Sequence, residues 1–295
     1  RYGGPSSGKS MAPSPPCPDT GDIVLKQLAR ATLKPVAAAF DTARPPAAGI
    51  TILIYHRVGA DSGGQVDLDV AMFDDQMAEL AAADNVISLD RAVELLASGA
   101  TFDHDSVVIT FDDGTPDVVD FALPVLERHA LPMTLYLATS FIEDGLGFWD
   151  PLDQPLSWTA AQEAASTGLV TIGSHTHTHA LLDRLAPAQI ADELDRSIDL
   201  IGSRLDVRAQ HFAYPKALLP SPQADAAVRA RFDSAAIAGT RPNSYGETDV
   251  HLLTRSPVQR SDGMRWFRRK AAGGMGLEDR VRDIVNTRRY AHATK

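Results

Sequence analysis

The chain has a single cysteine among its 295 residues, Cys17. One cysteine cannot form an internal disulfide, and it cannot build a cysteine-rich zinc site. Any metal ion that the protein binds must therefore be held by histidines and carboxylates. The nine histidines and 38 acidic residues of the chain are the available ligands.

Long apolar segments are also missing. No run reaches the roughly 20 consecutive apolar residues that a transmembrane helix needs, and the first residues lack the apolar core of a secretory signal peptide. With 44% hydrophobic and 22% charged residues, the composition is that of an ordinary globular protein. These features favour a cytoplasmic protein with one large core.

Positive charge is scarce over most of the chain. The net charge of −10 argues against nucleic acid as the main partner. Residues 261–295 are the exception, because nine Lys and Arg outnumber four Asp and Glu there. We expect this segment to be a basic, amphipathic helical extension. It either packs on the domain as a solvated helix or attaches the protein to an acidic membrane surface.

The first 48 residues show no strand pattern. Residues 3–10 match the phosphate-binding pattern G-x-x-x-x-G-K-S, but no strand precedes them and a proline-rich segment follows, so we reject this match. Residues 1–20 are expected to be a disordered leader or tag. Residues 21–48 are expected to be a helical segment on the outside of the domain.

From residue 49 to 260 apolar runs alternate with segments of helical periodicity. The runs that predict strands are 50–55, 86–89, 107–111, 133–138, 169–173, 210–214 and 234–238. The predicted helices are 69–83, 90–98, 116–130, 159–167, 187–205 and 222–231. Strands that alternate with helices pair in parallel, and the helices cover them. We predict an α/β fold, a (β/α) barrel of seven or eight mostly parallel strands, although an open doubly wound sheet fits the same periodicity.

Two acidic residues, Asp112 and Asp113, directly follow the predicted strand 107–111. Successive residues of a strand point to opposite faces, so both carboxylates can reach one site only where the strand ends, and Gly114 supplies that ending. Ligands bind at this edge of parallel sheets. A simpler interpretation is that one Asp caps the next helix, but this gives the second carboxylate no role.

Three histidines follow the predicted strand 169–173. His175 and His179 are four residues apart, so both can face one ion, while His177 is a third ligand or only a neighbour. With Asp113 the pair provides two nitrogens and one oxygen, and coordination positions stay open for water and substrate. We expect one divalent ion, with zinc first and cobalt, nickel, iron or manganese able to use the same ligands. Adventitious metal binding by a histidine-rich loop is the alternative.

These segments resemble the first three motifs of the polysaccharide deacetylase family, also called the NodB-homology domain or carbohydrate esterase family 4. The matching segments are Thr110-Phe-Asp-Asp-Gly114, His175-Thr-His-Thr-His179 and Phe212-Ala-Tyr-Pro215. The resemblance covers roughly residues 50–258 and implies a catalytic domain over 49–260 with a distorted (β/α) barrel. It implies a hydrolase that removes N- or O-acetyl groups from an acetylated glycan or amino sugar with one divalent metal ion. It also implies that Asp112 is the catalytic base and that Asp113, His175 and His179 hold the metal.

The third motif departs from the family pattern. Its usual arginine, which orients the catalytic Asp, is absent from the segment Ala213-Tyr-Pro-Lys-Ala217. Arg255 is our candidate for this task, and a structural or surface role is its alternative. The resemblance further implies that a backbone N–H near Tyr214, Pro215 and Lys216 stabilises the oxyanion.

We expect His56 to be the acid that protonates the leaving group. The segment Ile52-Leu-Ile-Tyr-His56 resembles the opening motif of a circularly permuted branch of the family, typified by poly-N-acetylglucosamine deacetylases. The first and last strands of a closed barrel are neighbours, so moving the late histidine strand to the front keeps its histidine at the same mouth. His251 is the reserve candidate. Trp149 follows a strand and is either a platform for a sugar ring or a packing anchor.

Two other functions fit parts of this pattern. Two histidines and one carboxylate also form the facial triad of iron oxygenases, but those predict a jelly-roll pattern of strands and give Asp112 no role. The missing arginine motivates the second alternative, a non-catalytic protein of the same fold that binds glycans.

Overall fold

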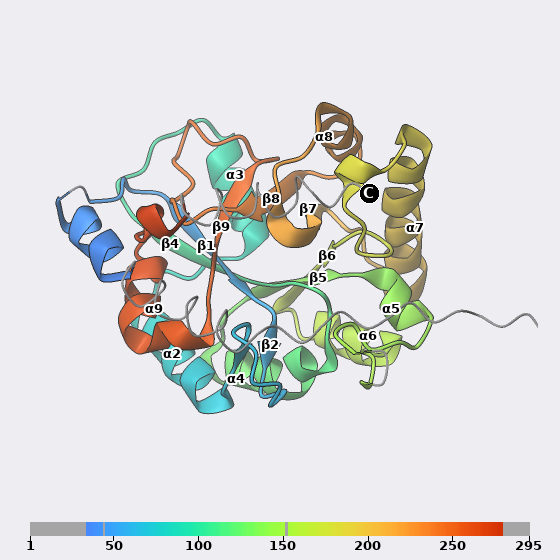
Figure 1. The fold of residues 1–295 in the computed structure, drawn as a ribbon, viewed down its shortest axis with the longest axis horizontal. Helices are drawn as coiled ribbons and strands as arrows, with labels where there is room; N and C mark the ends of the chain where they lie inside the picture. Colours follow the sequence, from blue (N-terminus) through green and yellow to red (C-terminus); the bar gives the residue numbers. More distant parts are fainter. Residues whose placement is uncertain (1–33, 44, 151–152, 280–295) are drawn as a thin grey trace, which may run out of the picture.

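The computed structural model of the protein describes residues 34–43, 45–150 and 153–279. In these residues seven parallel strands close into a barrel in the order β1-β4-β5-β6-β7-β8-β9, and β9 pairs back to β1 (Figure 1). The strands are β1 (Ile50–Tyr55), β4 (Ser106–Phe111), β5 (Met133–Leu137), β6 (Val170–Ser174), β7 (His211–Ala213), β8 (Ser234–Ala238) and β9 (Leu253–Pro257). The short strands β2 (Arg57–Val58) and β3 (Asp67–Leu68) pair with each other beside it. The predicted parallel barrel is confirmed, and the open sheet is excluded.

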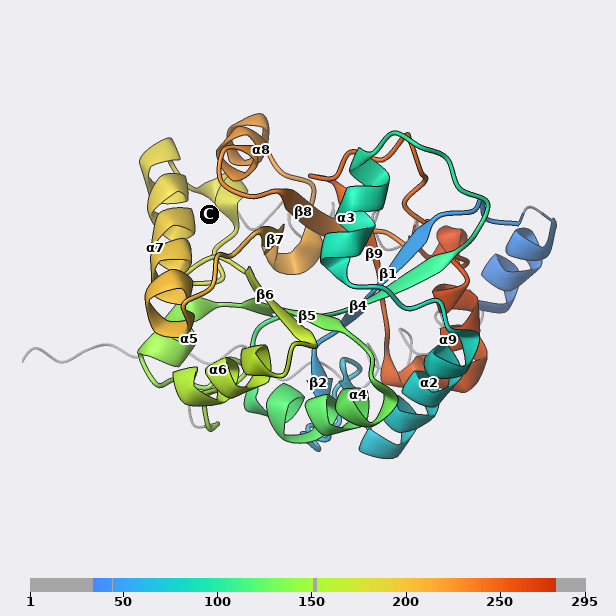
Figure 2. The same ribbon diagram turned by 180° about the vertical axis from the view of Figure 1, so that it is seen from behind.

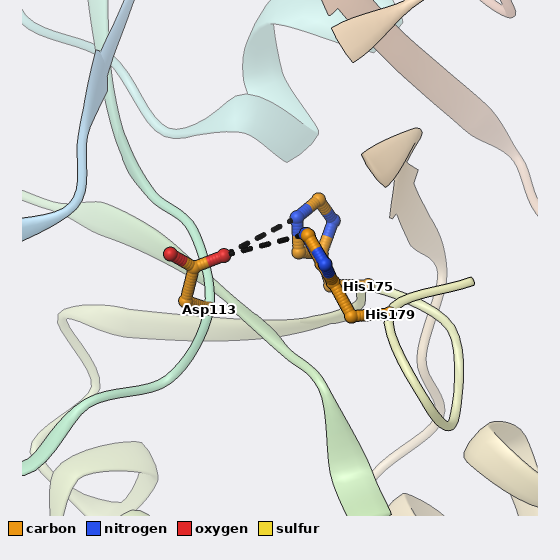
Figure 3. A group of neighbouring side chains, drawn as sticks. All are labelled: Asp113, His175 and His179. Atoms are coloured by element: carbon orange, nitrogen blue, oxygen red, sulfur yellow. Dashed lines mark ion pairs between the residues drawn. The ribbon is translucent and has the colours of Figure 1, made fainter. Parts of the chain in front are cut away.

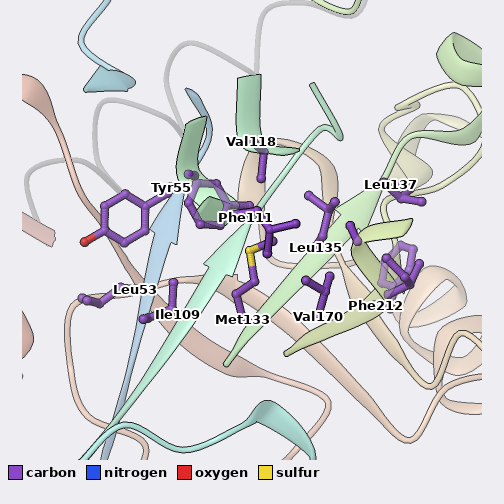
Figure 4. Packing of buried hydrophobic residues seen from close by; sticks show 14 of the residues in the cluster. Leu53, Tyr55, Ile109, Phe111, Val118, Met133, Leu135, Leu137, Val170 and Phe212 are labelled. Atoms are coloured by element: carbon purple, nitrogen blue, oxygen red, sulfur yellow. The ribbon is translucent and has the colours of Figure 1, made fainter. Parts of the chain in front are cut away.

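The barrel strands are buried on both faces. On β1, Ile50 and Ile52 belong to the cluster inside the barrel, whereas Leu53 and Tyr55 belong to the larger cluster between the barrel and the helices (Figure 4). A strand with two buried faces has a nearly continuous apolar sequence. This is why most of the strands could be recognised from the sequence.

Helices cover the outside of the barrel (Figures 1 and 2). The apolar stripe of α7 (Pro187–Leu205) is buried at Ile190, Leu194, Ile201 and Leu205. The other outer elements are α2 (Val70–Ala83), η1 (Val118–Ala122), α4 (Leu123–His129), α5 (Thr139–Glu143), α6 (Trp158–Ser166), α8 (Pro222–Arg229) and α9 (Gly263–Ala271). Single turns of 3₁₀ helix occur at η2 (Leu182–Arg184), η3 (Pro215–Ala217) and η4 (Arg260–Asp262). The helices predicted between residues 69 and 231 all begin and end within two residues of their predicted bounds.

One helix, α3 (Leu89–Ala97), lies at the amino ends of the strands. Its buried residues share the cluster inside the barrel with Ile50 and Leu253, and both views place it beside β8 and β9 (Figures 1 and 2). Asp90 in its first turn accepts a hydrogen bond from Thr171 (3.0 Å) and is paired with His211 (3.1 Å). Because α3 fills this end, a site inside the barrel can open only at the carboxyl ends of the strands.

Two details of the strand prediction are wrong. Residues 86–89 do not form a strand, because Val86 makes a single bridge to Val107 and Ser88 already caps α3 by accepting a hydrogen bond from the Arg91 N–H. The prediction also omits β9, in which Thr254, Arg255 and Ser256 interrupt the apolar pattern. The last barrel strand is polar because it carries a charged side chain into the barrel interior.

The segments before and after the barrel are joined to each other. Residues 34–43 are helical, within the helical segment predicted for 21–48, and α9 packs Phe267 into the outer cluster. The buried ammonium groups of Lys34 and Lys270 lie 2.6 and 2.9 Å from the carboxylate of Asp262. The described part of the basic extension is thus packed on the barrel. Among the described helices none has the length and apolar character that a membrane crossing requires. The predictions for residues 1–33 and 280–295 lie outside the described residues.

Candidate metal and catalytic site

The two acidic residues of the first motif lie at the carboxyl end of β4. The Asp112 N–H still donates to Tyr55 O (3.1 Å), so Asp112 continues the strand and its side chain faces the barrel interior. Asp113 and Gly114 then both have positive φ, 76° and 77°, which turns the chain sharply. A Cβ on Gly114 would lie 2.7 Å from Leu137 Cδ2, so only glycine fits this turn. The turn allows two consecutive carboxylates to face one site.

Asp113 meets the two outer histidines of the second motif (Figure 3). Its Oδ1 lies 3.6 Å from His175 Nε2 and 3.7 Å from His179 Nε2, and the three ligand atoms all lie within 4.8 Å of one another. These separations are too long for hydrogen bonds. They are close to the about 3.3–3.4 Å between ligand atoms around a tetrahedral ion with bonds of about 2.0–2.1 Å. The geometry and chemistry of the three donors therefore fit a divalent cation.

The orientation of His175 is fixed by the neighbouring strand. Its Nδ1 lies 2.7 Å from the carbonyl oxygen of Ala213, which can only accept, so Nδ1 carries the proton and donates. The other nitrogen, Nε2, is then unprotonated and points at Asp113. A ligand histidine held by a backbone carbonyl in this way is typical of metal sites.

The middle histidine does not join this group. His177 is buried, and its Nδ1 forms a hydrogen bond of 3.0 Å with Thr139 Oγ1 on α5. The ligand group found among the described residues contains Asp113, His175 and His179 only. Of the two interpretations of His177, the structure supports a neighbour and not a third ligand.

Arg255 lies beside Asp112, inside the barrel. Its two terminal nitrogens lie 2.6 and 2.8 Å from the two Asp112 carboxylate oxygens, and one also donates to Thr110 Oγ1 at 3.0 Å. The guanidinium carbon is 5.1 Å from the centre of the Tyr136 ring. Arg255 is completely buried. The strand omitted from the prediction thus supplies the bidentate partner of Asp112, and Arg255 does not have the surface role considered as its alternative.

The two carboxyl groups have opposite pKa shifts. Burial disfavours the charge of Asp112, but the Arg255 and His175 side chains outweigh this and hold the pKa of Asp112 well below its usual range. Burial and then the charge of Asp112 raise the pKa of Asp113 well above its usual range. Arg255 therefore keeps the Asp112 carboxylate ionised. The Asp113 carboxyl group would be ionised only with a cation bound next to it.

Burial also keeps the ligand histidines neutral. It lowers the pKa of His175, and together with the neighbouring His175 and Lys216 it lowers the pKa of His179 to about 2. Histidine binds a metal only when neutral. The local environment thus favours the protonation state that a metal ligand needs.

His56 follows β1 at the same mouth. Its Nδ1 is buried and has no hydrogen-bond partner among the described residues. Burial lowers the pKa of His56 to about 4, although the Asp112 charge acts in the opposite direction.

Trp149 lies next to His56 at the rim of the site. The two ring centres are 6.3 Å apart, and Trp149 is 44% exposed. An aromatic ring next to the site is thus open to a ligand.

Two other predicted residues lie elsewhere. His251 precedes β9, at the amino ends of the strands, and its Nε2 donates to the Phe232 carbonyl (2.9 Å), so it is at the wrong end to serve as the acid. The Tyr214 ring is buried against Phe212 in the outer layer. The backbone N–H of Tyr214 donates to the carbonyl oxygen of Ala236 (3.0 Å).

Of the three residues predicted to offer an N–H to an oxyanion, two are excluded. The Tyr214 N–H is already used, and Pro215 has no N–H. Lys216 has an exposed side chain and a φ of 58°, and its charge contributes to lowering the pKa values of His56 and His179. The amide of Lys216 is the remaining candidate.

Sequence reasoning missed two contacts of the site. Phe148 packs edge-on against His179 with ring centres 4.9 Å apart. Glu193 on α7 accepts hydrogen bonds from the N–H groups of His177 and Thr178. Phe148 could have been suspected as the neighbour of Trp149, but a glutamate in the middle of an amphipathic helix gives no such signal.

With the site described, the chain can be compared with known proteins. Residues 99–234 match the family profile described as Polysaccharide deacetylase. A Bacillus subtilis (strain 168) protein, provisionally named polysaccharide deacetylase YxkH, is 27% identical over 171 residues. The aligned region is 57% of this chain and 57% of that protein, so the similarity spans little more than half of the relative.

Solved structures share the barrel. The Streptococcus pyogenes deacetylase PplD, solved in complex with acetate, has a TM-score of 0.67 at 19% identity and covers 77% of this chain and 99% of its own. IcaB from Ammonifex degensii has a TM-score of 0.65 at 21% identity, with 77% and 98% covered. The similarities confirm the predicted fold.

Proposed function

We propose that this chain, which carries a polysaccharide deacetylase domain, is a metal-dependent hydrolase that removes acetyl groups from an amino sugar of a glycan. One observation carries the proposal. Two histidines and Asp113 converge beside a second carboxylate that is held ionised by a buried arginine, all at the mouth of the barrel.

The proposed metal ligands are Asp113, His175 and His179. A divalent cation bound there would acidify a water molecule and polarise the acetyl carbonyl. The ligand set is neutral imidazole and carboxylate, which suits zinc and also cobalt, nickel, iron or manganese. The positive charge of the cation would also stabilise the ionised form of the buried Asp113 carboxylate.

Asp112 is the proposed base. Arg255 holds both of its oxygens at 2.6 and 2.8 Å, which fixes the carboxylate and keeps it ionised at neutral pH. Each oxygen has a further lone pair that can accept a proton from the attacking water. The water oxygen would attack the acetyl carbon, and the proposed donor to the resulting oxyanion is the Lys216 N–H.

His56 is the proposed acid. Its pKa of about 4 means that it is neutral in the free enzyme at pH 7. The proton that it gives to the leaving amine must therefore be the one that Asp112 takes from water, passed on within the same cycle. This transfer breaks the carbon–nitrogen bond, releases acetate and leaves both residues as they began.

Replacing His56 by Gln should lower kcat about 10²-fold while metal content and KM stay close to those of the unchanged protein, since general acid catalysis contributes about 10²–10⁴-fold. The kcat/KM of the unchanged enzyme should not fall between pH 6 and 8 through loss of a proton from His56, because a histidine with a pKa of about 4 is already almost fully deprotonated at pH 6. Steady-state kinetics over this pH range and metal analysis test both statements. An unchanged kcat in the variant would show that His56 is not the acid. His251→Gln, at the far end of the barrel, is the control.

The substrate side of the site contains Trp149. Its ring is half-exposed and adjoins both His56 and Phe148, with ring centres 6.3 and 5.6 Å away. A rigid exposed aromatic next to the reacting groups suits stacking against a sugar ring. The similar fold of a deacetylase solved with acetate is consistent with an acetyl group as the part removed.

The activity itself is tested by incubating the zinc-loaded protein with a panel of N- and O-acetylated glycans and measuring released acetate. We expect release from at least one N-acetylated member, loss of release after complete removal of metal by a chelator, and recovery when zinc or cobalt is added. Release that survives complete metal removal would contradict the metal site. Binding of glycans with no release from any member would favour the non-catalytic alternative.

The structure bears on both alternatives. The absent third-motif arginine motivates a non-catalytic protein, but Arg255 on β9 binds both carboxylate oxygens of Asp112, so the proposed base does not lack a cationic partner. The oxygenase alternative predicts a jelly roll, whereas the chain forms a parallel barrel. Deacetylation is therefore the function that the geometry favours.

The cytoplasmic location, the absence of a nucleic-acid partner and the attachment of the basic C-terminal segment to a membrane surface stay predictions from composition. Attachment would be useful to the proposed enzyme only if its glycan were linked to a lipid.

A further inference from the structure

The loop that carries the two ligand histidines has an unfavourable backbone. Thr176 and His179 have φ values of 66° and 59°, in the left-handed region that few non-glycine residues adopt. Thr176 is β-branched, which makes that region still less favourable. Its hydroxyl is buried without a partner among the described residues, so it does not hold the loop. Other groups must keep residues 175–179 in this conformation.

One carboxylate makes three hydrogen bonds to the middle of the loop. Glu193 Oε2 accepts from the N–H groups of His177 (3.0 Å) and Thr178 (2.8 Å), and its Oε1 accepts from Thr178 Oγ1 (2.7 Å). Both bonded N–H groups belong to the residues between His175 and His179. Hydrogen bonds to an ionised group are stronger than neutral ones. Glu193 therefore holds the part of the chain whose shape decides how the two ligands are spaced.

The rest of the loop is held by its neighbours on either side. The His177 carbonyl accepts from the Ser140 N–H (2.8 Å) and its ring is bonded to Thr139, both on α5. Ser197 on α7 bonds Ser174 at the end of β6 (2.7 Å). Ser197 thus fixes the start of the turn, and α5 holds the His177 ring and carbonyl, whereas Glu193 is the side chain that bonds two consecutive loop N–H groups. Nothing in this arrangement needs Glu193 to touch the metal.

We propose that Glu193 is a positioning residue that presets the His175–His179 spacing and thereby sets the affinity of the site for its divalent cation. The inference rests on the proposed metal site. Its carboxylate acts through the loop backbone and donates no ligand atom. Groups that orient metal ligands in this way typically change metal affinity about 10–100-fold when they are removed.

The test is to measure Zn²⁺ and Co²⁺ dissociation constants of the full chain by competition with a chromophoric chelator. Glu193→Ala removes all three hydrogen bonds, and Glu193→Gln keeps the size and one acceptor oxygen. We expect the affinity to fall about 10–100-fold in Glu193→Ala and less in Glu193→Gln. The Co²⁺ absorption spectrum should shift, and kcat at saturating metal should fall much less than the affinity.

Asp192→Asn is the matched control. Asp192 is the preceding residue of the same helix, is exposed, and pairs only weakly with Arg196 (3.7 Å). It should leave the dissociation constant unchanged. If Glu193→Ala does not fold, Glu193→Gln carries the test alone. A folded Glu193 variant with the affinity and Co²⁺ spectrum of the unchanged protein overturns the inference and leaves the proposed function standing. If the unchanged protein binds neither ion, the proposed metal site fails and this inference fails with it.

Discussion

Replacing Asp112 by Asn should lower kcat about 10²–10⁴-fold, the range expected when a general base is lost. The amide has the size of the carboxylate but cannot take a proton from water. Asp113, His175 and His179 are unchanged, so the variant should still bind one equivalent of metal. The measurement is acetate release at saturating substrate together with metal content.

A loss of activity could also come from damage to the barrel, so a partly exposed carboxylate that is paired with a buried histidine serves as control. Asp90→Asn alters the pair with His211 at the opposite end of the barrel. This variant should keep the kcat of the unchanged protein. Full turnover by a metal-loaded Asp112→Asn variant would show that another group removes the proton.

Replacing Arg255 by Met should destabilise the protein by about 3–5 kcal/mol at neutral pH, because it leaves a buried carboxylate without its partner. In the unchanged protein the pKa of Asp112 is lowered, so the pair contributes stability above the ordinary Asp pKa, and this contribution is lost as the pH falls. In the variant burial is no longer opposed by the guanidinium, and only His175 and His56 still act against it, so the pKa of Asp112 should rise. The folded variant then binds a proton on acidification, and the stability difference between the two proteins should narrow toward low pH.

Urea unfolding of the metal-free proteins at several pH values measures this difference. Arg229→Met is the control, because Arg229 pairs with Asp225 and Asp249 at the surface, where such pairs contribute about 0–1 kcal/mol. A stability loss in Arg255→Met that is small, or equal at all pH values, would contradict the assigned role of the buried pair. The same variant should also lose most of the proposed deacetylase activity, since Asp112 would no longer be held or kept ionised.

The fold was predictable where one physical rule determined the sequence. Helix α7 has the predicted bounds because its apolar stripe repeats with the helical period, and β4 was recognised because both of its faces are buried. β9 was not recognised, because Arg255, which faces the barrel interior, and Ser256, which faces the opposite side, interrupt its apolar pattern. Residues 86–89 were assigned wrongly because a short apolar run before a helix looks like a strand.

The residues that form the candidate site could be predicted from the sequence, but the contacts that hold them in place could not. Residues at the carboxyl ends of parallel strands meet at one mouth, which brings Asp113 and His175 together from distant segments. Which of the three alternating histidines turn toward Asp113 depends on the positive φ values of Thr176 and His179. Those depend in turn on Glu193, a residue one helix further along the chain. Contacts between a loop backbone and a later helix leave no pattern in the sequence.

The closure of the barrel by β9 has a consequence for the order in which the protein matures. The ribosome releases Asp112 143 residues before it releases Arg255. Until β9 docks between β8 and β1, Asp112 lacks the guanidinium that binds both of its carboxylate oxygens. We therefore expect the barrel to close and Asp112 to gain its arginine partner in a single late step.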